Sequence, residues 1–121
     1  PDYFEFPKDF LGAVSRYAAR LKTPGTERKM ASAIWGGASK GVIFALFMER
    51  AGAKIDIVID INPAKQGKYL AATGLMVRSP ADAMHMLVPG ADIFVMNSNY
   101  LSEIQELTAH QFNYLLVEQA A

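Results

Sequence analysis

The chain has 121 residues, of which 51% are hydrophobic, so a single domain of this length can bury an ordinary core. Twelve basic and twelve acidic side chains cancel, and no segment concentrates lysine and arginine as a nucleic-acid partner requires. The absence of cysteine excludes disulfides and thiolate metal sites. We therefore expect one globular domain that binds no nucleic acid.

Neither a metal centre nor a membrane segment is predicted. His85 and His110 lie far apart, without carboxylates at ligand spacing. No apolar run approaches the roughly 20 residues of a membrane-spanning helix, and the N-terminus lacks a secretion signal. These features predict a cytoplasmic protein. Because the sequence begins at Pro1, it is either a processed chain or a piece of a longer protein.

The first half of the chain predicts helix, strand, helix and strand. Apolar side chains recur every three or four positions over residues 8–22, the pattern of an amphipathic helix. Residues 30–35 are typical of a short strand. After a glycine-rich turn, residues 42–51 are apolar on nearly every side, so this predicted helix must be covered on more than one face. Residues 54–61 are rich in β-branched side chains, as in a buried parallel strand.

The second half continues the alternation. Ser79 is a predicted N-cap, with Pro80 at the first helical position and Asp82 as the acid of a capping box. The predicted elements are a polar loop at 62–74, a strand at 75–78, a helix at 80–87, a strand at 92–97, a helix at 100–107 and a strand at 114–118.

Strands that alternate with helices of about ten residues predict right-handed βαβ units. The expected fold is α/β, a Rossmann-like three-layer domain over residues 1–121, with a mostly parallel sheet flanked by helices. Ligands of such sheets bind beyond the carboxyl ends of the strands. The candidate binding residues are therefore those that follow the strands, at 36–41, 60–67 and 97–100.

The turn after the first strand reads GGASKG. Against the dinucleotide fingerprint G-x-G-x-x-G, Gly36 and Gly41 take the first and third positions, and Ala38 stands at the second. The first glycine permits a tight turn, the third allows close helix packing, and the helix N-terminus offers N–H groups to an anion. Gly37 lies within the turn, and Lys40 adds a positive charge. The alternative is a tight turn that needs glycines whatever it binds.

Polar side chains follow the second strand. Asp60 lies about where a dinucleotide-binding fold places the acid that binds a ribose, and alternatively it caps the turn together with Asn62. The loop also supplies the cations Lys65 and Lys68, the amide of Gln66 and the conformational freedom of Gly67. These residues either contact a phosphate or a partner's carboxylates, or form an ordinary solvated loop.

Asn97, Asn99 and Tyr100 follow the strand at 92–97. They either bind a base or sugar through amide hydrogen bonds and ring contact, or cap the next helix. The chain has no Tyr-x-x-x-Lys pair, no G-x-S-x-G elbow and no cysteine nucleophile. It therefore lacks a complete active site, and no catalytic residue is predicted.

Four blocks of the sequence together resemble one family. They are IWGGASKG, VIDINPAKQGKYLAATG, the Ser-Pro pair that opens the next helix, and NSNYLSEI. Their order and approximate spacing are similar to those of the C-terminal domain of S-adenosylmethionine-dependent C-methyltransferases that act on nucleotide-linked deoxysugars. The resemblance spans residues 33–107, and DINPAKQGKY is its most specific part. The sequence departs from the family at residues 71–74, often Pro-Gly-Thr-Gly, and at Ser98, where proline is common.

This resemblance implies an accessory domain that is not catalytic in isolation. Members of the family have a zinc-binding region and a methyltransferase domain before a C-terminal domain that helps to hold the sugar nucleotide. S-adenosylmethionine and the catalytic bases are thus expected outside this sequence, in the same or a partner chain, and a nucleotide-linked sugar is the expected ligand. The positions that match the family are the turn glycines, Lys40, residues 60–69, Asn97, Asn99 and Tyr100.

Two other functions fit the sequence. The glycine turn and Asp60 also suit a small NAD(P)-binding module of an oxidoreductase or a redox sensor, although hydride-transfer residues are absent and 121 residues build only one mononucleotide-binding half. Alternatively, the domain has lost ligand binding and serves as an interaction surface. The apolar helix near 42–48 suits that role only if part of it stays uncovered.

Overall fold

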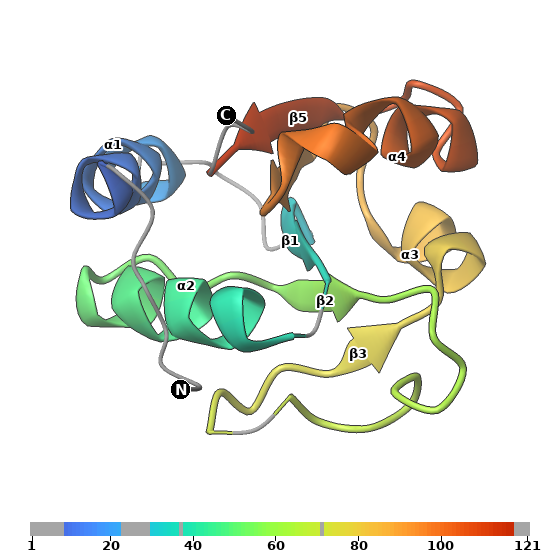
Figure 1. Cartoon of the computed structure of the whole chain (residues 1–121), viewed down its shortest axis with the longest axis horizontal. Helices are drawn as coiled ribbons and strands as arrows, with labels where there is room; N and C mark the ends of the chain where they lie inside the picture. Colours follow the sequence, from blue (N-terminus) through green and yellow to red (C-terminus); the bar gives the residue numbers. More distant parts are fainter. Residues whose placement is uncertain (1–8, 23–29, 37, 71, 118–121) are drawn as a thin grey trace.

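The computed structural model describes residues 9–22, 30–36, 38–70 and 72–117 (Figure 1). The elements are α1 (Phe10–Lys22), β1 (Ser32–Trp35), α2 (Ser39–Arg50), β2 (Ile57–Ile59), β3 (Val77–Arg78), α3 (Pro80–Met86), β4 (Asp92–Val95), the 3-10 helix η1 (Ser98–Tyr100), α4 (Leu101–Leu107) and β5 (Asn113–Leu116). Among the helices described, none combines the length and apolarity needed to cross a bilayer.

The strands form one five-stranded sheet in the order β3-β2-β1-β4-β5. Every neighbouring pair is parallel, which confirms the predicted α/β, Rossmann-like fold. From β1 the chain first moves outward through β2 and β3, and then returns to the other side of β1 to form β4 and β5. The strand order therefore reverses between β1 and β4, and ligands of open α/β sheets bind at such a switch point.

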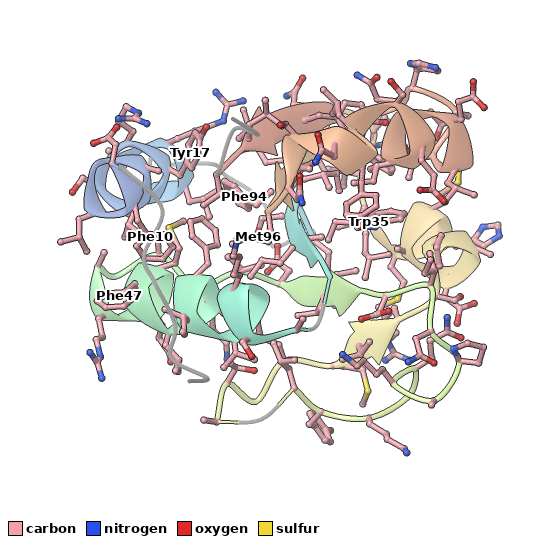
Figure 2. The ribbon with its side chains drawn as sticks, viewed as in Figure 1. Phe10, Tyr17, Trp35, Phe47, Phe94 and Met96 are labelled. Atoms are coloured by element: carbon pink, nitrogen blue, oxygen red, sulfur yellow. The ribbon has the colours of Figure 1, made fainter. Side chains whose placement is uncertain are left out.

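Helices cover both faces of the sheet, α1 and α2 on one and α3 and α4 on the other (Figure 1). Strands β1, β2, β4 and β5 supply both cores, because successive side chains point to opposite faces. In β1, for example, Ile34 joins the core beneath α1 and α2, whereas Ala33 joins the core beneath α3 and α4. Figure 2 shows Phe94 and Met96 on the first side and Trp35 on the second.

Helix α1 is attached to the rest of the domain by apolar and polar contacts. The ring of Phe10 meets those of Phe44 and Phe47 edge-on, at centroid distances of 6.3 and 5.7 Å. The Tyr17 hydroxyl donates a hydrogen bond of 2.6 Å to the Leu116 carbonyl at the end of β5. The amphipathic pattern that predicts this helix therefore reflects its packing on α2 and the sheet.

The prediction of Ser79 as N-cap and Pro80 as first residue of α3 is confirmed, and other element bounds shift. The Ser79 hydroxyl accepts the backbone N–H of Asp82 at 3.1 Å, and Pro80 takes the first helical position. Helix α2 begins earlier than predicted, at Ser39, and β2 is shorter because Asp60 already turns the chain. The last strand, predicted at 114–118, begins at Asn113 and ends at Leu116. Residue 8 of the predicted first helix, Gly37 of the predicted turn and residue 118 lie outside the described residues.

The predicted polar loop at 62–74 is partly ordered by backbone pairing. Gly67 N–H donates to the Val77 carbonyl at 2.8 Å, and Val77 N–H donates to the Lys68 carbonyl at 2.8 Å. Tyr69 and Met76 form an antiparallel bridge. The loop thus covers the outer edge of β3, an edge that would otherwise expose unpaired backbone groups.

Candidate functional site

A cavity of about 350 Å³ opens at the carboxyl ends of β1, β2 and β4, where the strand order reverses. Trp35, Val95 and Met96 contribute from the strand ends, and α4 forms a wall with Glu103, Ile104 and Leu107. The remaining lining residues are Gly36, Asp60, Ile61, Asn97 and Tyr100, which follow the three strands. Its volume falls within the usual range for small-molecule sites.

The cavity surface is mainly apolar. Trp35 and Val95 are register partners on β1 and β4, so their side chains lie next to each other on the same face of the sheet. Ile104 of α4 is buried in the core to which Val95 and Trp35 also belong. At the opening, Ile61, Tyr100 and Leu107 are 56%, 57% and 45% exposed. Apolar and aromatic groups are thus available to a base or to a sugar ring.

The charged residues that line the cavity are both acidic. They are Asp60, whose side chain is 13% exposed, and Glu103 on α4. Two carboxylates near an enclosed apolar surface repel a phosphate and accept hydrogen bonds from hydroxyl or amino groups. The cavity therefore suits the uncharged part of a ligand. Within the described ranges, His, Asp and Glu side chains do not gather in threes as a metal ion would need.

Asp60 is held by the loop that follows it. Its Oδ1 accepts the backbone N–H of Asn62 at 2.9 Å, and Lys65 Nζ lies 4.0 Å from its Oδ2. The Gln66 side-chain amide donates to the Asp60 carbonyl at 2.8 Å. The Asn62 side chain in turn accepts the N–H of Ala64 at 3.0 Å. The predicted turn-capping alternative is thus present for Asp60 and Asn62, and it fixes the carboxylate beside the cavity.

The glycine turn places β1 and α2 in close contact. Gly36 has φ +106°, and its N–H donates to the Ile59 carbonyl at 2.7 Å. A Cβ on Gly41 would lie 2.3 Å from the Gly36 carbonyl oxygen. Both glycines are therefore required by the backbone itself. Ala38 is the N-cap residue of α2 and provides no side-chain cap, so its exposed methyl group stands where the fingerprint has a glycine.

The segment after β4 combines capping with a place at the cavity. Asn97 Oδ1 accepts the N–H of Asn99 at 2.9 Å and so caps η1, as one alternative predicted. Asn97 and Tyr100 also line the cavity, whereas Asn99 is exposed and outside its lining. The capping bond fixes the turn that carries Tyr100 to the opening.

The structure brings some predicted residues together and separates others. Gly36, Asp60, Asn97 and Tyr100 meet at the cavity. Lys65 instead lines a second cavity of about 230 Å³ next to α2, together with Lys68 and Tyr69. The predicted residues outside both linings are Lys40, Gly41, Asn62, Gln66, Gly67 and Asn99.

Several residues of the cavity were not predicted from the sequence. Trp35 and Ile104 are apolar residues in regular elements, so a sequence pattern assigns them to the core. Glu103 and Leu107 lie four positions apart on α4 and therefore share a face of that helix. The four-residue spacing of Glu103 and Leu107, shortly after the NSNY segment, is therefore the sequence signal that could have indicated this wall of the cavity.

Comparisons with known proteins support the fold. No family model matches the sequence, and no curated protein matches it. Among solved structures, the crystal structure of RSP, a Rex-family repressor, is similar with a TM-score of 0.53 at 9% sequence identity. The match covers 98% of this chain and 89% of the repressor. At such low identity the similarity shows a shared Rossmann-like fold.

Proposed function

We propose that this chain is a nucleotide-binding module that holds the nucleoside or sugar end of a nucleotide-linked ligand. The observation that carries this proposal is the cavity at the switch point, which gathers Gly36, Asp60, Asn97 and Tyr100 from three separate loops. Such convergence of polar groups on an apolar cavity is typical of a binding site.

The charges suggest how the ligand lies. Hydroxyl groups of a ribose or hexose donate hydrogen bonds to Asp60, and a ring packs against the exposed face of Tyr100. The phosphates stay outside the acidic cavity, toward the turn at Gly36 and the first turn of the 12-residue helix α2. The N–H groups there and the charge of Lys40 favour an anion.

Within this function, we propose a nucleotide-linked sugar as the ligand and an S-adenosylmethionine-dependent C-methyltransferase as the parent protein. Support comes from the sequence blocks that resemble the C-terminal domain of those enzymes, because three of them supply lining residues: Gly36, Asp60 and Tyr100. Methyl transfer then occurs in another domain, and this module only holds the substrate.

The second candidate is an NAD(P)-binding module of an oxidoreductase or a redox sensor. The strand order and the place of Asp60 at the end of β2 are those of dinucleotide-binding domains, and the structural similarity to a Rex-family repressor supports that fold. The residues fit an adenosine ribose well. They fit the pyrophosphate less well, because the Ala38 methyl group restricts its approach to the turn.

Calorimetric titration with ADP, uridine diphosphate glucose and NAD tests the proposal and separates the candidates. We expect binding of at least one, with Asp60→Asn weakening it by about tenfold, since a charged hydrogen-bond acceptor is lost. Asparagine keeps an acceptor oxygen for the Asn62 N–H, so the turn is preserved. Asp82→Asn, at an exposed position on α3, is the control and leaves affinity unchanged. Absence of binding to all three compounds would contradict the proposal.

A further inference from the structure

Arg78, the last residue of β3, is a partly buried cation without a partner among the described residues. Its Nε is buried and makes no hydrogen bond. The other described arginines differ, since Arg16 and Arg20 pair with carboxylates and Arg50 lies over the Phe47 ring. An unsatisfied buried donor on a charged group is costly and rare in folded proteins, so it calls for a physical explanation.

The sheet register places Arg78 on the face and edge that carry the cavity. Arg78 pairs with Ile59, Ile59 with Trp35, and Trp35 with Val95. Paired residues point to the same face, and neighbouring strands lie about 5 Å apart. Trp35 and Val95 line the cavity, and Arg78 is the charged member of this row.

Arg78 also lies directly beside Asp60. The Asp60 N–H donates to the Arg78 carbonyl at 3.0 Å, so the backbones of the two residues are neighbours at the strand ends. Lys65 Nζ, 4.0 Å from Asp60 Oδ2, partly offsets the negative charge at this point. A ligand group that extends from Asp60 toward β3 would therefore meet a net positive charge.

We propose that Arg78 binds an oxyanion on the ligand, beside the cavity and separate from the phosphates at the glycine turn. The group is either a phosphate monoester on the ribose or a carboxylate on the sugar, because a guanidinium binds both through paired hydrogen bonds. Its Nε–H then gains the acceptor that the described residues do not provide. This assignment rests on the proposed nucleotide-binding function.

Inorganic phosphate tests the site directly. In a titration of the intact chain followed by proton-nitrogen NMR, the Arg78 Nε–H signal shifts saturably with phosphate and not with sodium chloride at equal ionic strength. The Nε–H of Arg50, an exposed residue at the end of α2, serves as the internal control. An unchanged Arg78 signal, or an equal response to chloride, would overturn the assignment.

Paired ligands then identify the source of the oxyanion. Adenosine 2′,5′-bisphosphate is compared with AMP, and uridine diphosphate glucuronic acid with uridine diphosphate glucose. We expect the member with the additional oxyanion to bind about tenfold more tightly in one of the pairs, the usual contribution of a charge-assisted hydrogen bond. Arg78→Gln removes that preference without changing affinity for the member that lacks the additional oxyanion, and Arg50→Gln retains it. Equal affinities within both pairs overturn the proposal. If neither AMP nor uridine diphosphate glucose binds, the nucleotide-binding function fails, while the phosphate titration still decides the role of Arg78.

Discussion

Gly41 leaves no room for a side chain in the turn beside the cavity. Its substitution by alanine places a Cβ 2.3 Å from the backbone oxygen of Gly36, which cannot move without distorting the turn. Alanine would favour the helix by about 1 kcal/mol, but overpacking usually costs about 1–3 kcal/mol. We expect Gly41→Ala to lower the free energy of unfolding by up to about 2 kcal/mol, the difference between these two effects, measured by urea denaturation and circular dichroism.

Ser39→Ala is the matched control for this substitution. Ser39 is exposed in the first turn of the same helix and accepts no capping bond, so its change should stay within about 0.5 kcal/mol. If Gly41→Ala unfolds at the urea concentration of the wild type, the close packing of α2 on the turn does not limit stability.

Single residues of the site could be predicted only where a general rule applies to them. The rule that ligands bind after parallel strands selects Gly36, Asp60, Asn97 and Tyr100, all of which line the cavity. The same rule also selects Lys65, which the fold of its loop directs to a second cavity. Arg78 escapes prediction because the burial of its Nε and the absence of a described partner for that atom are properties of the assembled fold, which no local sequence pattern reports.

Among the elements, α1 is attached to the sheet by an ion pair between Arg20 and Asp92. Arg20 Nε and Nη2 donate to the two carboxylate oxygens of Asp92 in β4, at 2.7 and 3.0 Å. Asp92 is 8% exposed, so removal of its partner leaves a largely buried carboxylate. Because the Arg20 side chain is 48% exposed, we expect Arg20→Met to lower the free energy of unfolding by only about 1–2 kcal/mol in urea denaturation.

The double variant Arg20→Met, Asp92→Asn checks the cause. It should recover part of the loss, because no unpaired carboxylate remains, and a strictly additive loss would contradict the ion-pair explanation.

The contribution of this ion pair to stability depends on pH with a definite sign. The hydrogen bond and charge of Asp92 raise the pKa of Arg20 above its ordinary value. Arginine's part of this stabilisation is therefore complete below its unfolded pKa and disappears only in strongly alkaline solution, as the pH rises through the raised pKa.

Most elements could be predicted from the sequence, because each has a local signal. Apolar spacing marks α1, and Ser79, Pro80 and Asp82 mark the start of α3. The pairing of residues 67–70 with β3 has no such signal, since it uses backbone groups of a polar loop. The register that aligns Arg78 with Trp35 is likewise a property of the assembled sheet.

In the whole molecule, the sheet belongs to two cores at once. Phe44 of α2 is fully buried against Phe94 of β4, with ring centroids 5.2 Å apart. The neighbours of Phe94 in the same strand, Ile93 and Val95, belong to the core on the other face. A loss of packing under α2 therefore weakens strands on which α3 and α4 also depend, and the two faces should unfold together.

Trp35 allows this coupling to be measured. It is the single tryptophan and lies on the α3 and α4 face (Figure 2). Phe44 belongs to the core on the opposite face. We expect Phe44→Leu to lower the free energy of unfolding by about 1–2 kcal/mol, less than the 3–5 kcal/mol typical of truncation to alanine. The urea midpoints from Trp35 fluorescence and from circular dichroism should shift equally. Leu11→Ala, at a position 63% exposed, should shift neither. A Trp35 transition that stays at the wild-type midpoint while the circular dichroism transition moves would show that the two faces unfold as separate units.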